Sequence, residues 1–189
     1  MPRWDPDAEL RLRAAAADLF AERGYSEVTT AEIAQRAGLT RRSFFRYFAD
    51  KREVVFPRVD ELAMALERAL TALPQEASLS QLSEAVFGVL AQAGEFITAD
   101  REGQRRRQAL ISQSFELQER ERTKLAASAS TIEQSYTARG LDSGALFGAV
   151  AMEVFRAAYQ AALHDEGTVP FRARLDAVRL STGAFLTPG

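Results

Sequence analysis

The sequence has no cysteine and a single histidine, His164, among its 189 residues. The absence of thiols excludes a disulfide framework, a thiolate nucleophile and a cysteine-based metal site, and it is compatible with a reducing cytoplasm. No recognisable motif places a serine or acidic partner for His164, so nucleophilic and metal catalysis are both unsupported. We therefore expect no enzyme activity and no cofactor.

Long apolar stretches are also lacking. No run of about 18 apolar residues occurs, and the N-terminus, MPRWDPDAELR, carries charges where a signal peptide needs an apolar core. We expect a soluble, cytoplasmic protein that has no membrane partner. Its hydrophobic content of 47% and charged content of 26% are ordinary for a globular chain, and its length suffices for one or two packed units.

The chain also has little net charge, only −2. This balance argues against bulk affinity for nucleic acid, so any DNA binding requires a local concentration of positive charge. Residues 36–52 provide one, because they hold six cationic side chains and one acidic side chain, a balance of +5. The cations are Arg36, Arg41, Arg42, Arg46, Lys51 and Arg52.

The basic residues fall within a segment, 29–51, whose pattern predicts two short helices and a tight turn. Thr29 and Glu32 have the spacing of a capping box. Gly38, which has no Cβ, suits a left-handed helix end, and Thr40 can cap the second helix. In that helix we expect two inward aromatic residues and four outward polar residues: Phe44 and Phe48, then Arg41, Arg42, Ser43 and Arg46. The pattern predicts a helix-turn-helix with a basic second helix.

Many positions of the 12–56 block coincide with the pattern of one family. They are Leu19-Phe20, Gly24, Thr29 or Thr30, Ile33-Ala34, Ala37-Gly38, Phe48 and Lys51. The block thereby resembles the TetR family of one-component transcriptional regulators. Two positions depart from the family pattern: Phe45 stands where a tyrosine that contacts a DNA phosphate is usual, and Tyr47 stands where histidine is usual.

The resemblance implies that the basic helix reads double-stranded DNA, whereas in an arbitrary helical protein it would be a solvated face. Residues at the start of such a helix reach base edges, and arginine suits the O6 and N7 atoms of guanine. The base-reading candidates are Thr40, Arg41, Arg42 and Ser43. The phosphate candidates are Thr29, Thr30, Tyr47, which could replace the missing tyrosine contact, and Lys51. Phe45 and Arg46 complete the predicted DNA-binding set.

Helical periodicity continues through the rest of the chain, without strand alternation, and predicts an all-α fold of about nine helices. We place a DNA-binding domain at residues 1–56 and a larger helical domain at 57–189. Asp50 and Glu53 form a second possible capping box, which predicts a long helix from Asp50 to about Pro74. Pro57 would lie inside it, either as a fixed kink or as a hinge for signalling. The run Arg105–Arg107 is either solvated or faces an anionic ligand.

The family keeps a ligand cavity among its middle helices, and methionines and aromatic residues would suit an apolar effector. Candidates that are also consistent with an ordinary core are Met64, Phe87, Phe96, Phe115, Tyr136, Met152, Phe155 and Tyr159. The helix over 146–163 has more apolar surface than one protomer should cover, so we expect a homodimer built from the last two helices, with Phe171, Leu175, Val178 and Phe185 on the second. The resemblance implies a ligand-responsive repressor of a near-palindromic operator; a helical DNA-binding or partner-binding dimer without an effector is the alternative.

Overall fold

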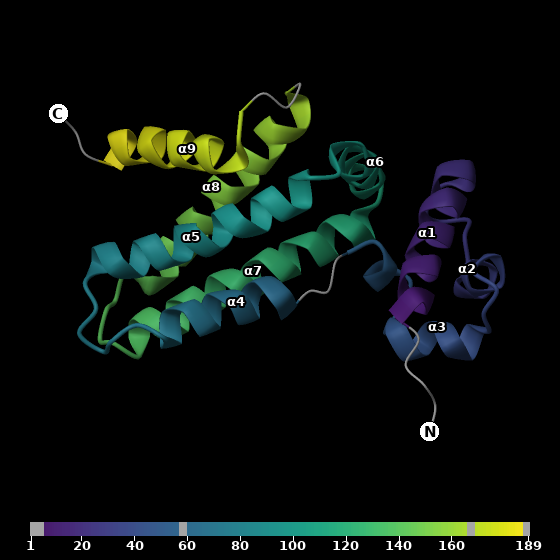
Figure 1. Cartoon of the computed structure of the whole chain (residues 1–189), viewed down its shortest axis with the longest axis horizontal. Helices are drawn as coiled ribbons and strands as arrows, with labels where there is room; N and C mark the ends of the chain where they lie inside the picture. Colours follow the sequence, from purple (N-terminus) through teal and green to yellow (C-terminus); the bar gives the residue numbers. More distant parts are fainter. Residues whose placement is uncertain (1–5, 57–59, 166–168, 187–189) are drawn as a thin grey trace. The chain divides into compact units, whose positions relative to one another are not determined.

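The computed structural model describes residues 6–56, 60–165 and 169–186. Within these residues the secondary structure consists of nine α-helices and one short 3₁₀ helix, with no strand, which confirms the all-α prediction. The chain divides into two compact units (Figure 1). The first comprises the described parts of residues 1–58 together with 106–120, and the second comprises those of 59–105 and 121–189. The predicted hinge residue, Pro57, lies outside the described residues.

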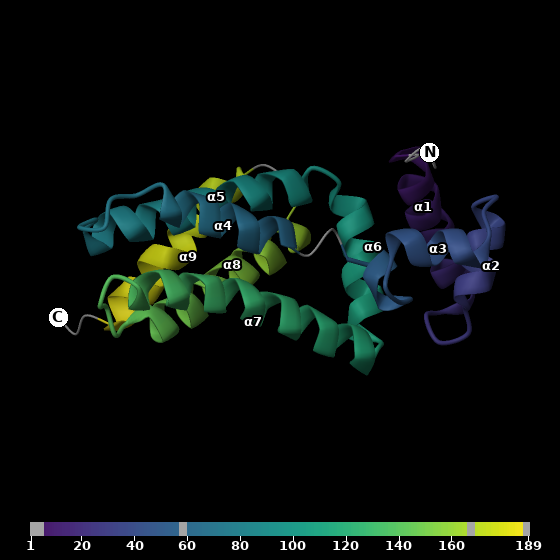
Figure 2. The ribbon, with the colours of Figure 1, turned by 90° about the horizontal axis from the view of Figure 1, so that it is seen from below.

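The first unit is built on three helices, α1 (Pro6–Arg23), α2 (Thr30–Arg36) and α3 (Arg41–Tyr47). Helix α2 packs against both α1 and α3, and the three helices cross one another (Figures 1 and 2). Their inward faces form an apolar core, which is the reason that such short helices are stable together. Its fully buried members include Leu12, Ile33, Ala34, Phe44 and Phe56.

The segment after α3 differs from the predicted long helix. Asp50 does cap a helical turn, because its carboxylate accepts hydrogen bonds from the backbone N–H groups of Arg52 at 2.8 Å and Glu53 at 3.3 Å. That turn is only the 3₁₀ helix η1 (Arg52–Val54), and the next helix, α4, begins at Asp60. The long helix from Asp50 was therefore a wrong prediction. Proline at position 57 has no N–H to continue an α-helical ladder from Glu53, and the Arg13 side chain donates hydrogen bonds to the carbonyls of Val54 and Phe56.

The second unit is a bundle that contains α4 (Asp60–Thr71), α5 (Leu79–Thr98), α8 (Gly144–His164) and α9 (Phe171–Leu186). Helix α5 packs against α4, α8 and α9, and α9 also lies against α8 (Figure 1). The bundle core includes Leu66, Leu82, Val86, Leu90, Ile132, Tyr136, Ala158, Phe171 and Leu175. The approach of α9 to α5 requires glycine at one point, since a Cβ on Gly94 would lie 2.0 Å from a carbon of the Phe171 ring.

Two helices contribute residues to both units. These are α6 (Arg101–Ser112) and α7 (Phe115–Thr137), whose connection lies within the 106–120 segment of the first unit. Ile111 and Leu117 flank this connection and are buried in the core of the first unit. The core around the helix-turn-helix therefore uses residues more than fifty positions beyond Phe56.

The interface residues expected on α9 have another role. Phe171 and Leu175 are buried in the core of their own protomer, and Val178 packs against that core, whereas the Phe185 side chain lies outside the described residues. Helix α8 packs against α5 and α9, but Leu146 near its start remains exposed. The predicted dimer contact through Leu175 was therefore wrong, because this side chain is completely buried within its own bundle. Val178 is only partly buried, and its contact with a second copy stays a prediction.

Candidate DNA-binding site

The helix-turn-helix is shaped by local side-chain and backbone bonds. The Thr29 hydroxyl accepts the Glu32 N–H at 3.3 Å, and the Glu32 carboxylate accepts the Thr29 N–H at 2.8 Å, which confirms the capping box. Helix α2 then ends at Gly38, whose φ of +70° is left-handed, and the Leu39 N–H bonds the Ala34 carbonyl at 2.8 Å. The Thr40 hydroxyl accepts the Ser43 N–H at 3.1 Å and so begins α3.

Helix α3 has a buried side and a charged, exposed side. Phe44 is fully buried and packs against Phe48 with ring centres 5.3 Å apart. Burying each ring stabilises the folded protein by about 1.5–3 kcal/mol. Because both rings must face the core, they fix the rotation of the helix about its axis. The rotation leaves four side chains exposed: Arg41, Arg42, Phe45 and Arg46.

The six cations of residues 36–52 fall into two groups. Three are engaged within the unit: Arg36 forms two hydrogen bonds, of 2.9 and 3.0 Å, with the Glu22 carboxylate; Arg52 pairs with Asp50; and Lys51 bonds backbone carbonyls. The Arg36 guanidinium lowers the pKa of Glu22, and the Arg52 guanidinium lowers that of Asp50, as expected of paired carboxylates. The other three are the arginines of α3.

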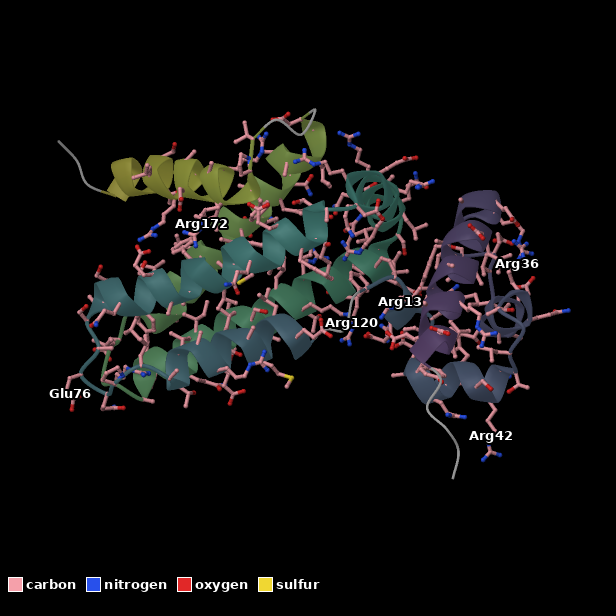
Figure 3. The ribbon with its side chains drawn as sticks, in the orientation of Figure 1. Arg13, Arg36, Arg42, Glu76, Arg120 and Arg172 are labelled. Atoms are coloured by element: carbon pink, nitrogen blue, oxygen red, sulfur yellow. The ribbon has the colours of Figure 1, made fainter. Side chains whose placement is uncertain are left out.

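The α3 arginines make no ion pair within the part of the chain that the structure describes. The guanidinium carbon of Arg41 lies 5.6 Å from the centre of the Phe45 ring, and that of Arg46 lies 5.7 Å from the centre of the Tyr47 ring. Arg42 projects from α3 away from the rest of the first unit (Figure 3). Of the positive charge in residues 36–52, one part is therefore engaged by carboxylates and carbonyls of the same unit. The part that has no acidic partner among the described residues lies on the exposed face of α3.

Lys51, a predicted phosphate contact, lies against the loop between α1 and α2. Its ammonium donates hydrogen bonds to the backbone carbonyls of Tyr25 at 2.9 Å and Val28 at 3.0 Å, and it lies 4.1 Å from the centre of the Tyr25 ring. The Tyr25 hydroxyl donates to the Glu116 carboxylate at 3.4 Å, and burial and that carboxylate raise the pKa of Tyr25. Sequence reasoning missed this structural role, because the two carbonyls are more than twenty residues away.

Arginine side chains hold the turn that follows α3. Arg13 of α1 donates to the carbonyls of Val54 at 2.9 Å and Phe56 at 2.5 Å, and Arg107 of α6 donates to the carbonyl of Val55 at 3.1 Å. In the second unit Arg105 donates to the Leu163 carbonyl at 2.6 Å. Two members of the 105–107 run therefore satisfy backbone carbonyls instead of facing a solvated surface or an anion.

The predicted effector residues fall into separate environments. Five are buried in the core of the second unit: Phe87, Tyr136, Met152, Phe155 and Tyr159. Burial raises the pKa of Tyr136 to about 12, and the Tyr159 hydroxyl donates to the Gln104 amide oxygen at 2.9 Å. Met64 on α4 and Phe96 on α5 are exposed, and Phe115 is an exposed residue of the 106–120 segment, which belongs to the first unit.

A capped second helix with an exposed cationic face, held on α1 and α2, defines a helix-turn-helix protein. Residues 12–56 match the family model described as bacterial regulatory proteins, tetR family. The likeness to this family therefore lies in residues 12–56, the segment that holds the helix-turn-helix. No helix among the described residues is long and apolar enough to cross a membrane.

One relative and two solved structures illustrate the similarity. A protein named as a mycofactocin biosynthesis transcriptional regulator, MftR, from Mycobacterium tuberculosis is 31% identical over 103 residues, which are 54% of this chain and 50% of that protein. The match thus spans about half the length of this relative. A complex of SmeT with triclosan, SmeT being the repressor of a multidrug efflux pump of Stenotrophomonas maltophilia, has a TM-score of 0.62 and 16% identity over 93% of this chain and 91% of that chain.

The second structure is FadR of Thermus thermophilus, a TetR-family transcriptional repressor in complex with lauroyl-CoA. It has a TM-score of 0.54 and 21% identity over 96% of each chain. At such low identity the two structures show a shared fold, which extends through the second unit as well as the first.

Proposed function

We propose that this protein is a DNA-binding transcriptional regulator, a repressor that binds a near-palindromic operator as a homodimer and is released by a small apolar or amphipathic ligand. The observation that carries the proposal is the exposed face of α3, on which Arg41, Arg42 and Arg46 have no acidic partner among the described residues, although Arg36 and Arg52 nearby are both paired. A face kept cationic in this way suits the phosphate-lined major groove.

The exposed positions suggest which residues contact bases and which contact phosphates. Arg41 and Arg42, at the start of α3, are placed to reach base edges, and each bidentate contact to guanine discriminates by about 1–3 kcal/mol. The Thr40 and Ser43 hydroxyls lie 3.0 Å apart and bond each other, so in the groove they act together. Thr29, Thr30, Arg46 and Tyr47 are assigned to phosphates. Lys51 has one N–H left for a phosphate, because two of its three donors bond carbonyls.

Dimerisation is assigned to the outer faces of α8 and α9. Leu146 on α8 and Leu180 on α9 are large apolar side chains exposed to the extent of 69% and 74%. Burying them against a second copy would remove apolar surface from water and pair two recognition helices by two-fold symmetry. The half-sites would then lie about one helical turn apart, or a multiple of it.

The ligand is assigned to the second unit. This fold carries triclosan in SmeT and lauroyl-CoA in FadR, both of which have large apolar parts. Phe87, Tyr136, Met152, Phe155 and Tyr159 are the apolar and aromatic residues of this chain that a ligand between the helices would meet. A dimer that binds DNA without any effector is the second candidate, and it is favoured by the close packing of these same residues.

The DNA-binding proposal is tested by selecting bound sequences from random duplex DNA and measuring affinity for the winning site by fluorescence anisotropy. We expect an inverted repeat. Arg42→Ala should weaken that site by about 1–3 kcal/mol and relax one position of it. Arg36→Ala, a matched control whose guanidinium already binds Glu22, should leave the preferred sequence unchanged. Recovery of no preferred sequence by the wild-type protein would contradict the proposal.

Release by a ligand is tested separately. A panel of amphipathic compounds is screened for a saturable rise in the melting temperature, and each hit is then added to the protein–operator complex. A ligand can release the operator only through its different affinity for the two conformations, typically about 1–3 kcal/mol. A hit that raises the melting temperature and weakens operator binding supports the repressor, whereas hits that leave operator affinity unchanged favour the dimer without an effector.

A further inference from the structure

Phe45 is an apolar side chain in the middle of the cationic face of α3. The nearby phenylalanines Phe44 and Phe48 are buried, but Phe45 is 47% exposed. It lies one helical turn beyond Arg41 and Arg42, and it is adjacent to Arg46. A large exposed aromatic residue among exposed arginines suggests a partner that presents an apolar group beside negative charge.

The Phe45 ring contacts two side chains of its own helix, Phe44 and Arg41. Its centre lies 5.4 Å from that of Phe44, with an interplanar angle of 81°, so that a buried ring braces it edge to face. The Arg41 guanidinium also lies over this ring, 5.6 Å from its centre. The exposed part of the ring is thus positioned before any partner binds, as a shape-specific contact requires.

DNA offers few apolar groups to such a ring. In the major groove the only one on a base edge is the C5-methyl group of thymine. A phosphate is a poor partner, because Phe45 has no hydroxyl with which to donate a hydrogen bond. Arg41 extends from the same flank of the helix, one turn nearer its start, and suits a guanine.

We propose that Phe45 is a specificity-determining residue that packs against the methyl group of a thymine adjacent to the base read by Arg41. The inference rests on the proposed DNA-binding function and deepens it. Arg41 and Phe45 would then recognise two neighbouring bases together, Arg41 through a charged contact with one and Phe45 through an apolar contact with the other. The position at which this family usually places a phosphate-binding tyrosine then contributes sequence information in this chain.

The experiment removes the methyl group from the DNA. Each thymine of the selected operator is replaced in turn by deoxyuridine, which differs only by lacking the C5-methyl group, and the affinities of wild-type protein and variants are compared. For the wild type we expect one thymine per half-site at which uracil lowers affinity by about fourfold, the effect of about one buried methyl group. Phe45→Ala should bind the thymine and uracil sites equally.

Two further variants separate the contact from general effects. Phe45→Leu keeps an apolar side chain and should retain part of the preference for thymine. Phe96→Ala removes a phenylalanine that is 83% exposed on α5, so it should leave the preference unchanged. Circular dichroism melting checks that each variant is folded. Because the readout is the ratio between two DNA sites for one protein, a loss of active protein does not alter it.

The outcomes also distinguish this inference from the function on which it rests. If the wild-type protein selects no sequence, the proposed function fails. If it selects an operator but tolerates uracil at every thymine, or if Phe45→Ala keeps the wild-type preference, the inference is overturned while the regulator remains. A Phe45→Ala protein that loses affinity for all DNA alike, with the thymine preference intact, would make Phe45 a sequence-independent contact and would overturn the inference as well.

Discussion

The ammonium of Lys51 lies 4.1 Å from the centre of the Tyr25 ring and donates a 2.9 Å hydrogen bond to the backbone carbonyl of the same residue. One side chain thereby ties the segment after α3 to the start of the loop that follows α1. The Tyr25 ring also packs against Phe20. Lys51, which matches a lysine of the family pattern, therefore helps to hold the helix-turn-helix together.

Replacement of Lys51 by alanine should destabilise the protein by about 1–3 kcal/mol, because two carbonyls would lose a charged donor. Urea unfolding followed by circular dichroism measures this change. The control is Arg52→Ala, whose exposed pair with Asp50 should contribute less than about 1 kcal/mol. If the remaining N–H of Lys51 also meets a phosphate, the variant's salt dependence of DNA binding should become shallower by about one phosphate. Equal stability of the two variants would contradict the structural role.

Glu32 should make the stability of the protein depend on pH in the acid range. Hydrogen bonds from the Thr29 hydroxyl and the Thr29 N–H, and then the Arg23 side chain, lower its pKa from the ordinary 4.5 to about 2. Because the folded protein holds the proton less tightly than the unfolded chain, this contribution is full above pH 4.5 and is lost as the pH falls towards about 2.

Glu32→Gln should therefore flatten the fall in stability across that range. The measurement is urea unfolding of both proteins at several pH values from about 2.5 to 6. Glu27→Gln, at an exposed position of the preceding loop, is the control and should follow the wild-type curve. Parallel curves for wild type and Glu32→Gln would show that the capping box does not carry this dependence.

Leu180→Glu should convert the dimer into a monomer and leave the fold intact, because this side chain is 74% exposed in the protomer. Sedimentation at micromolar concentration measures the first effect and circular dichroism the second. Leu175→Ala provides the contrast: that side chain is completely buried within its own bundle, so its truncation should cost about 2–5 kcal/mol of stability. A wild-type protein that sediments as a monomer would rule out the dimer altogether.

Gly38→Ala and Gly88→Ala should change stability in opposite directions. Beyond the adjacent residues and, for Gly88, the backbone of its own helix, neither glycine has an atom within 4 Å of the place a Cβ would occupy, so crowding does not distinguish them. Gly38 has a φ of +70°, at which alanine costs about 1–2 kcal/mol. Gly88 lies inside α5, where alanine should stabilise by about 0.5–1 kcal/mol. Thermal unfolding of both variants measures the difference, and a shift of the same sign in both would refute this argument.

The features that the sequence predicted well depend on neighbouring residues. The Thr29–Glu32 capping box, the cap at Thr40 and the left-handed Gly38 each involve residues a few positions apart, so their chemistry is visible in a short segment. The burial of Phe44 and the exposure of Arg42 follow from helical spacing in the same way.

The features that it could not predict depend on distant partners. Arg107 donates to the Val55 carbonyl, which lies 52 residues away, and no local pattern marks that bond. The spacing of Asp50 and Glu53 correctly predicted the start of a helix. It could not predict how short that helix is, because side chains from α1 and α6 bond the backbone carbonyls at its end. Leu175 shows the same limit, because periodicity identifies an apolar face without telling which surface covers it.

The contribution of residues 106–120 to the first unit has a consequence for building hybrid regulators. A chimaera that joined residues 1–56 of this chain to another protein's effector domain would leave behind Ile111 and Leu117 from the core, and Arg107 and Arg120 from the turn after α3. The transplanted DNA-binding domain would then have to pack its core against the α6–α7 connection of another protein. A working chimaera should therefore include residues 106–120 together with the DNA-binding domain. Alternatively, it should exchange only the exposed residues of α3 and leave the cores of both proteins unchanged.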